Sequence, residues 1–256
     1  MHSSSYTLTA LALAMRAAAG GLDDWHFGNM FSVGPATGGA YITKATYSLV
    51  PPNTPCGSVT ENPNDDPWMS IWIGLAQSLT DDGTDLFQPL LNWSPDQESA
   101  VYSYSACPGT VKEWCVAAST YTPAGQIQQE YQAVPSNAHL DFEVDVDSSK
   151  KVSQKVWTNG KLVSEQSDTN SVAPLCLYSG NECYKGTCGT LASYSWSNLT
   201  IVLSAADKAF GDSLILTNAT STGLTTSDDG KTWHVDSIDI NKDLFYYGVD
   251  QSDCSP

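Results

Sequence analysis

Apolar and polar residues alternate along most of this chain, a period-two pattern that is typical of half-buried β-strands. The alternating segments are rich in β-branched and aromatic residues, which favour strands. Asn159-Gly160 predicts a two-residue hairpin turn, because both residues tolerate a positive φ. Helical periodicity is scarce, and a short helix is predicted at residues 205–210 alone. The segments predicted as strands are residues 40–50, 69–75, 101–104, 140–146, 151–157, 194–203, 213–217 and 232–240.

Many short strands separated by turns indicate an all-β fold, and we expect an antiparallel two-sheet β-sandwich. The chain has 256 residues, of which 41% are hydrophobic, so it can bury a sizeable core. No segment has the composition of a linker, and we therefore predict a single domain over residues 21–256. Residues 1–20 are predicted to be a signal peptide, because a short apolar run precedes the small residues Ala17-Ala18-Ala19.

Three N-glycosylation sequons begin at Asn92, Asn198 and Asn218. Together with the signal peptide, they predict a protein that is secreted or resides in the lumen of the secretory pathway. The chain has seven cysteines, so an oxidising compartment would allow three disulfides and leave one thiol. The pairing stays open, although Cys107/Cys115 and Cys183/Cys188 are close enough to close local loops. Their spacing, with no histidine nearby, does not favour a metal site.

The formal net charge is −17, with 11 Lys and Arg residues in total. Nucleic acids and anionic membrane surfaces both require clustered cations, so neither is an expected partner. No apolar run approaches membrane-spanning length. The acidic pairs, such as Asp81-Asp82 and Asp228-Asp229, favour turns over calcium loops, because they lack the spaced ligands of such a loop.

Gln88 carries the most specific signal in the sequence. It lies in Asp85-Leu-Phe-Gln-Pro-Leu-Leu-Asn-Trp93, shortly after Trp72-Ile73-Gly74. This arrangement resembles the active-site segment of the fungal glutamic peptidases (eqolisins), secreted acid proteases with a concanavalin-like jelly-roll sandwich. That resemblance implies a catalytic Gln at position 88 and a catalytic Glu, which falls near Leu175, where no carboxylate is present.

The acids nearest to that position are Glu165 and Glu182, both in polar sequence that is typical of turns. Either could be the catalytic Glu if the register differs. The resemblance also implies a Glu at the centre of an aromatic strand of the family, and this chain has Ser103 at that position. A Gln without a Glu cannot move protons, but it can orient a polar ligand or polarise a carbonyl. We therefore expect an inherited β-sandwich cleft that works by shape and hydrogen bonding.

In size, signal peptide, sequons and cysteine-bearing β pattern, the chain also resembles the fungal hetero-Diels–Alderases of tropolone sesquiterpenoid pathways. That resemblance implies dehydration of a hydroxymethyl tropolone-type precursor to a quinone methide, followed by cycloaddition to an alkene such as humulene, without a cofactor. The expected partner is an apolar or aromatic small molecule, and a homodimer is left open. Gln88, Tyr102 and Tyr104 would supply hydrogen bonds. The residues expected to line the concave sheet and bind the substrate are Trp68, Trp72, Leu90, Asn92, Trp93 and Trp196.

Two alternatives remain open from the sequence. The first is an active acid endopeptidase, and the second is a glycan-binding module that stacks sugars on exposed aromatic rings. Four carboxylates at Asp141, Glu143, Asp145 and Asp147 alternate along one predicted strand. Paired carboxylates are typical of glycoside hydrolysis, but a charged strand face also protects an exposed sheet.

Overall fold

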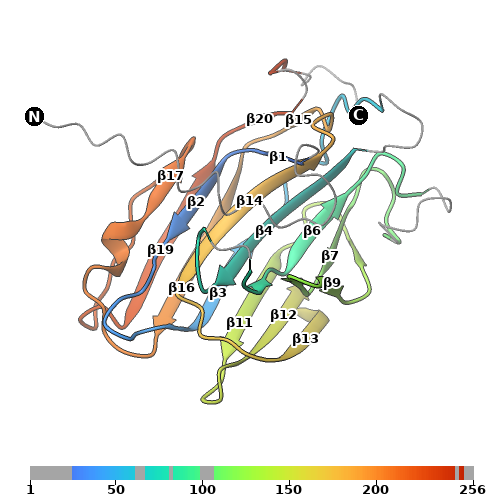
Figure 1. Ribbon diagram of the computed structural model, residues 1–256. Coiled ribbons are helices and arrows are strands. Elements are labelled where there is room, and N and C mark those ends of the chain that lie inside the picture. Colours follow the sequence, from blue (N-terminus) through green and yellow to red (C-terminus); the bar gives the residue numbers. More distant parts are fainter. Residues whose placement is uncertain (1–24, 61–66, 81–82, 99–106, 246–247, 251–256) are drawn as a thin grey trace, which may run out of the picture.

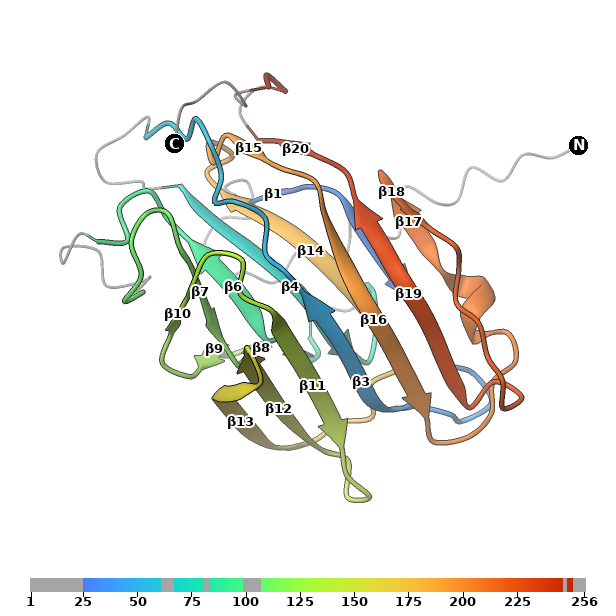
Figure 2. The same cartoon turned by 180° about the vertical axis from the view of Figure 1, so that it is seen from behind.

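The computed structural model of the protein describes residues 25–60, 67–80, 83–98, 107–245 and 248–250. In these residues, two antiparallel β-sheets pack face to face (Figures 1 and 2). The predicted all-β, antiparallel two-sheet sandwich is confirmed. The alternation in the sequence explains this architecture, because each strand turns one apolar side toward the other sheet.

Within the described residues, sheet A contains eleven strands, and its main path runs β10-β7-β6-β4-β14-β2-β17. β1 pairs with β14, while β5 connects β4 to β8, which pairs with β9. The strands along the main path are β10 (Gln132–Val134), β7 (Trp114–Ala117), β6 (Leu90–Trp93), β4 (Trp68–Ala76), β14 (Cys176–Tyr184), β2 (Met30–Val33) and β17 (Ile215–Thr217). The others are β1 (Trp25–Phe27), β5 (Leu86–Phe87), β8 (Ser119–Thr122) and β9 (Gly125–Gln128).

Sheet B contains seven strands in the order β13-β12-β11-β3-β16-β19-β18, and β15 and β20 form a separate pair. Its strands are β13 (Lys161–Ser171), β12 (Lys151–Thr158), β11 (Leu140–Val146), β3 (Ile42–Leu49), β16 (Tyr194–Leu203), β19 (Thr232–Ile240) and β18 (Ala219–Ser221). The separate pair is β15 (Thr190–Leu191) and β20 (Asp243–Leu244).

The main core lies between the two sheets and has an aromatic centre. Tyr47 stacks on Phe142 at 5.0 Å between ring centroids and meets Trp196 edge-on at 5.4 Å. The Tyr47 hydroxyl donates a hydrogen bond to the Ile73 carbonyl oxygen at 3.0 Å, which connects sheet B to sheet A. Burial of each such ring stabilises the fold by about 2 kcal/mol or more, so this cluster holds the sheets together.

A buried polar network closes the core where β14 meets β20. The Asp243 carboxylate accepts hydrogen bonds from the Asn29 backbone N–H at 3.0 Å and from the Asn181 side-chain amide at 2.6 Å. Asn181 in turn accepts a hydrogen bond from the Tyr194 hydroxyl at 2.6 Å. Burial raises the pKa of Asp243 to about 6. Gly28 allows this packing, because a Cβ there would lie 2.5 Å from the carboxylate.

Most predicted elements correspond closely to observed strands. Residues 140–146, 194–203 and 232–240 coincide with β11, β16 and β19. The Asn159-Gly160 hairpin is confirmed, with φ of 51° and 77° between β12 and β13. The strand predicted at residues 101–104 lies outside the described residues.

The helix predicted at residues 205–210 is wrong. A single turn of 3-10 helix, η2 (Phe210–Ser213), begins at the last residue of that segment instead. The Asp207 carboxylate accepts hydrogen bonds from the backbone N–H groups of Thr37 and Ala209. These bonds hold the segment in an irregular conformation, since a side chain that bonds nearby backbone groups competes with a helix.

Candidate functional site

The outer face of sheet A, which points away from sheet B, carries the predicted glutamine and its neighbours. Side chains of residues paired across antiparallel strands share one face, so the register defines rows on this face, spaced by about 7 Å. We name four rows by their chemistry. They are the aromatic row (Trp25, Tyr184, Trp68), the carboxyl row (Phe27, Glu182, Ser70, Asn92), the indole row (Gly180, Trp72, Leu90) and the amide row (Ser32, Tyr178, Gly74, with Gln88 beside Gly74).

The expectation that Glu182 belongs to a polar turn is wrong. Glu182 lies inside β14, in the middle of sheet A, between Phe27 on β1 and Ser70 on β4. Its side chain keeps partial contact with solvent. Burial among its neighbours raises its pKa from 4.5 to about 7. The indole N–H of Trp72 partly opposes this shift, although it does not make a hydrogen bond of normal geometry. Glu182 is therefore a carboxyl that is largely protonated in mildly acidic solution.

Glu165, the other alternative, does not share this face. It lies on β13, at the edge of sheet B, and its side chain is exposed opposite Lys155. Leu175, the position expected for the catalytic Glu, precedes β14 and donates its backbone N–H to the Ala76 carbonyl oxygen. Neither position brings a carboxylate to Gln88.

Among the residues that the structure describes, three buried polar atoms on the outer face of sheet A have no hydrogen-bond partner. They are Oγ of Ser32, Nε1 of Trp72 and Oε1 of Gln88, in side chains that are 1%, 3% and 6% exposed. Buried polar atoms are nearly always paired in folded proteins, because leaving one unpaired costs about 1–3 kcal/mol. One donor, one acceptor and one hydroxyl that can do both are thus left unpaired below the surface of this face.

Gln88 and Glu182 lie two rows apart, with the Trp72 ring between their rows. Four residues along β4 separate these rows, which corresponds to about 13 Å. The Trp72 ring lies over Gly180, since a Cβ at Gly180 would approach the ring carbons to 2.5 Å. In the amide row itself, the residue that faces Gln88 across Gly74 is Tyr178, whose pKa is raised by burial. A neutral phenol therefore occupies the position next to the glutamine.

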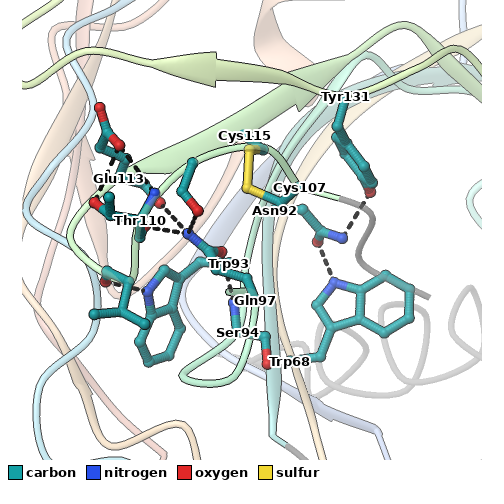
Figure 3. Close-up of a disulfide and its surroundings, with 12 residues drawn as sticks. Trp68, Asn92, Trp93, Ser94, Gln97, Cys107, Thr110, Glu113, Cys115 and Tyr131 are labelled. Carbon is teal, nitrogen blue, oxygen red and sulfur yellow. Dashed lines mark hydrogen bonds between the residues drawn. A yellow bond between two sulfur atoms is a disulfide. The ribbon is translucent and has the colours of Figure 1, made fainter. Parts of the chain in front are cut away.

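Asn92 is a structural centre of this face, and the predictions for it need correction. Its Oδ1 accepts hydrogen bonds from the Trp68 indole N–H and from the Ser70 hydroxyl, the latter at 2.6 Å. Its Nδ2 donates to the Tyr131 hydroxyl at 2.6 Å (Figure 3). The side chain is 1% exposed. The predicted glycosylation of Asn92 is therefore wrong, and its amide positions Trp68 and Ser70 instead of meeting a substrate.

Asn198 and Asn218, the other two sequon asparagines, are exposed residues with positive φ. The Asn218 Nδ2, however, donates a hydrogen bond to Asn29 Oδ1 at 2.9 Å, which a glycan would have to replace. Glycosylation there stays a prediction.

The predicted aromatic lining is only partly present on this face. Trp68 and Trp72 lie there, and Leu90 lies in the indole row as the alternation predicted. Trp93 is on the opposite side of β6, in the main core, where its indole N–H donates to the Val111 carbonyl oxygen at 2.8 Å. Trp196 is completely buried on sheet B. Placing Trp93 and Trp196 in the concave lining was therefore wrong, because one step along a strand reverses the face. Tyr102 and Tyr104 lie outside the described residues.

A second, smaller apolar cluster covers part of the outer face of sheet A. It includes Trp72, Leu90 and Tyr131, together with both cysteines of the Cys107–Cys115 disulfide. Figure 3 shows this disulfide and Tyr131. The structure also contains the Cys183–Cys188 disulfide, immediately after Glu182, and Cys56 is disulfide-bonded as well. Disulfides fit a secreted or lumenal protein, as the sequence predicted.

Cys176 is the free thiol among the described cysteines. Burial raises the pKa of its thiol to about 12. It stays a thiol at physiological pH and is a poor nucleophile.

The strand carboxylates on sheet B have structural partners. Glu143 is 2.6 Å from the Lys44 ammonium, and Asp141 accepts a hydrogen bond from Ser48 at 2.7 Å. Asp147 lies in the turn after β11, where it accepts hydrogen bonds from the Ser149 and Lys151 backbone N–H groups. These contacts favour the interpretation of a charged outer surface over that of a glycosidase pair. In the described part of the chain, no cluster of three metal-ligating side chains occurs, and no helix is long and apolar enough to cross a membrane.

No family model and no curated protein sequence matches the chain. Among solved structures, scytalido-glutamic peptidase with a transition-state analogue inhibitor is 11% identical, with a TM-score of 0.47, over 84% of this chain and 97% of the peptidase. SCP-B, a member of the eqolisin family, is 11% identical with a TM-score of 0.43, over 85% of this chain and 98% of its own. A Bacillus licheniformis β-glucanase is 12% identical with a TM-score of 0.31, over 84% and 78%. The similarity concerns the arrangement of strands, not the chemistry.

Proposed function

We propose that the protein is a cofactor-independent small-molecule enzyme of a fungal secondary-metabolite pathway. The proposed reaction is the dehydration of a hydroxymethyl tropolone-type precursor to a quinone methide, followed by hetero-Diels–Alder addition to an alkene such as humulene. The observation that carries the proposal is the outer face of sheet A. It combines a carboxyl with a raised pKa, three unpaired buried polar atoms and aromatic walls.

The dehydration needs a proton for the leaving hydroxyl, and Glu182 is the residue that can supply it. With a pKa of about 7, it is protonated in mildly acidic solution yet can lose its proton readily. As the C–O bond breaks, Glu182 donates its proton and water leaves. The ring hydroxyl of the precursor then gives its proton to the Glu182 carboxylate. The quinone methide is thus neutral, and the acid is restored.

The cycloaddition forms one C–C bond and one C–O bond and requires no proton transfer. The protein has to hold the two reactants in one relative pose, which is worth several kcal/mol of the barrier. Trp72 Nε1 can donate a hydrogen bond to the oxygen of the diene, while Gln88 Oε1 can accept one from a ring hydroxyl. The rings of Trp72 and Tyr178, 5.4 Å apart, provide an apolar wall for a flat reactant.

The separation of Gln88 from Glu182 favours this function over peptide hydrolysis. A glutamine and a glutamate that activate one water must both lie within hydrogen-bonding distance of it. Here about 13 Å separates their rows, and the Trp72 ring lies between them. The proposal therefore retains Glu182 as an acid and Gln88 as a hydrogen-bonding group, with separate tasks.

The test uses the full chain, expressed through a eukaryotic secretory pathway and incubated with the tropolone-type alcohol and humulene at pH 5–6. We expect one stereoisomer of the adduct by chiral liquid chromatography and mass spectrometry, where the uncatalysed mixture reacts slowly and gives several. Absence of acceleration would refute the proposal. If casein were instead cleaved at about pH 2–4, and Gln88→Ala abolished the cleavage, the protein would be an acid peptidase.

A further inference from the structure

The aromatic row presents rings from three neighbouring strands. Tyr184 on β14 lies between Trp25 on β1 and Trp68 on β4, and all three side chains are half-buried. The Trp25 ring centroid is 5.2 Å from that of Tyr184 and 5.8 Å from that of Trp68. Rings in tilted and edge-on contact stabilise one another and form a continuous apolar patch.

The chemistry of the aromatic row differs from that of the indole and amide rows. The unpaired buried atoms on this face, in Ser32, Trp72 and Gln88, all lie in the indole and amide rows. In the aromatic row, the Trp68 indole N–H is already bonded to Asn92. The Lys185 ammonium lies 4.9 Å from the Tyr184 ring centre. Apart from the Tyr184 hydroxyl and the Lys185 ammonium, the aromatic row thus offers carbon surface, whereas the unpaired buried atoms lie on the other side of Glu182.

The spacing of the rows along the strands places Glu182 between the aromatic row on one side and the indole and amide rows on the other. The aromatic row and the indole row each lie about 7 Å from the carboxyl row, on opposite sides. One medium-sized ring covers a distance of this order, so two ring-sized reactants could lie side by side with Glu182 at their boundary. Phe27, which is directly opposite Glu182 on β1, extends the apolar surface toward that boundary.

We infer that Trp25, Phe27, Trp68 and Tyr184 form a second subsite, which binds a hydrocarbon reactant without hydrogen-bonding groups. The oxygenated reactant occupies the neighbouring surface of Trp72, Tyr178 and Gln88. This inference rests on the proposed function and adds to it a division of the outer face of sheet A into two subsites. The reactants then meet above Glu182, where the quinone methide is formed.

The test compares Trp25→Ala and Trp25→Leu with Trp157→Ala, which removes a partly exposed tryptophan from β12 on the other sheet. Binding of humulene alone is measured by equilibrium dialysis with the full chain. Trapping of the quinone methide by a small thiol reports dehydration separately. We expect Trp25→Ala to weaken humulene binding about tenfold, through the loss of ring contacts, and to leave the trapping rate unchanged. Trp25→Leu should lose less affinity, and Trp157→Ala none.

The possible outcomes separate a failure of the proposed hydrocarbon subsite from a failure of the proposed reaction. Unchanged humulene binding in both Trp25 variants, with normal melting curves, would overturn the subsite even if the reaction is confirmed. A parallel loss of trapping rate and humulene affinity would also overturn it, because one shared pocket would then hold both reactants. If the wild-type chain yields no trapped quinone methide but binds humulene in a Trp25-dependent way, the proposed reaction fails while the hydrocarbon site stands.

Discussion

Replacement of Glu182 by glutamine is the most direct test of the site, because we expect it to lower the activity and to raise the stability at high pH. Glutamine has nearly the shape of a protonated glutamate but cannot release a proton. General acids contribute about 10²–10⁴-fold to rates, and we expect Glu182→Gln to lower the rate of quinone methide formation by that factor. In the wild-type protein the same rate should fall as the pH rises through about 7, because the acid loses its proton.

The effect on stability follows from the raised pKa. The folded protein holds the Glu182 proton up to about pH 7, whereas the unfolded chain releases it near 4.5. The stability that this proton provides is complete below pH 4.5 and is lost as the pH rises through 7. The difference corresponds to about 2–3 kcal/mol, allowing for the partial solvent contact of the side chain.

At pH 8 the Glu182→Gln protein should therefore be more stable than wild type, by about 2–3 kcal/mol, and at pH 4.5 the two should be alike. For a chain of this size the gain corresponds to a melting temperature higher by about 4–10 °C. Thermal unfolding followed by circular dichroism from pH 4 to 8 measures it. Glu165→Gln, on the exposed edge of sheet B, should retain the wild-type profile. Parallel profiles for wild type and Glu182→Gln would refute the idea that Glu182 is held neutral.

Four further changes test other parts of the structure. Gln88→Leu removes an unpaired buried carbonyl, so turnover should fall about tenfold while the melting temperature holds or rises; a clear loss of stability would contradict this. Asn92 should carry no glycan in peptide mass spectra after enzymatic deglycosylation, and deamidation there would reveal one. Gly160→Ala should cost about 1–2 kcal/mol in urea unfolding, because φ is positive; an unchanged midpoint would exclude the left-handed turn. Asp243→Ala leaves the Asn181 amide unpaired and should cost about 2 kcal/mol or more at pH 5, seen as faster amide hydrogen exchange in β14; unchanged protection would argue against the network.

Alternation predicted the strands that cover the core, because their two faces meet different surroundings. β11, β16 and β19 each turn one apolar side inward and one polar side outward. The extent of β13 beyond the predicted hairpin turn was missed, since Ser164 and Gln166 occupy its buried positions. Their side chains form hydrogen bonds to the Ala118 N–H and the Thr120 hydroxyl. Where the inward-facing residues are polar, apolar and polar residues no longer alternate, so the strand cannot be predicted from that alternation.

A polar residue at an inner position also explains why Glu182 was not predicted to lie in a strand. β14 carries Asn181 on its inner face and Glu182 on its outer face, so the segment looks like a turn in sequence. Asn181 can be fully buried because Asp243 and Tyr194, far away in sequence, pair with its amide. Gln88 was singled out because its local motif is specific, and its role as a site residue stays a prediction. Trp93 was misplaced because the faces of a strand can be assigned from sequence only once its register is known.

Gly180 carries no functional group, yet it controls the level at which the Trp72 ring rests on the sheet. The nearest ring carbon would be 2.5 Å from a Cβ at that position. Even one methyl group would therefore lift the indole and alter the room beside Glu182, with the acid, the amide and the disulfides untouched. New substrate shapes could thus be accommodated by exchanging a residue that no list of catalytic groups would include.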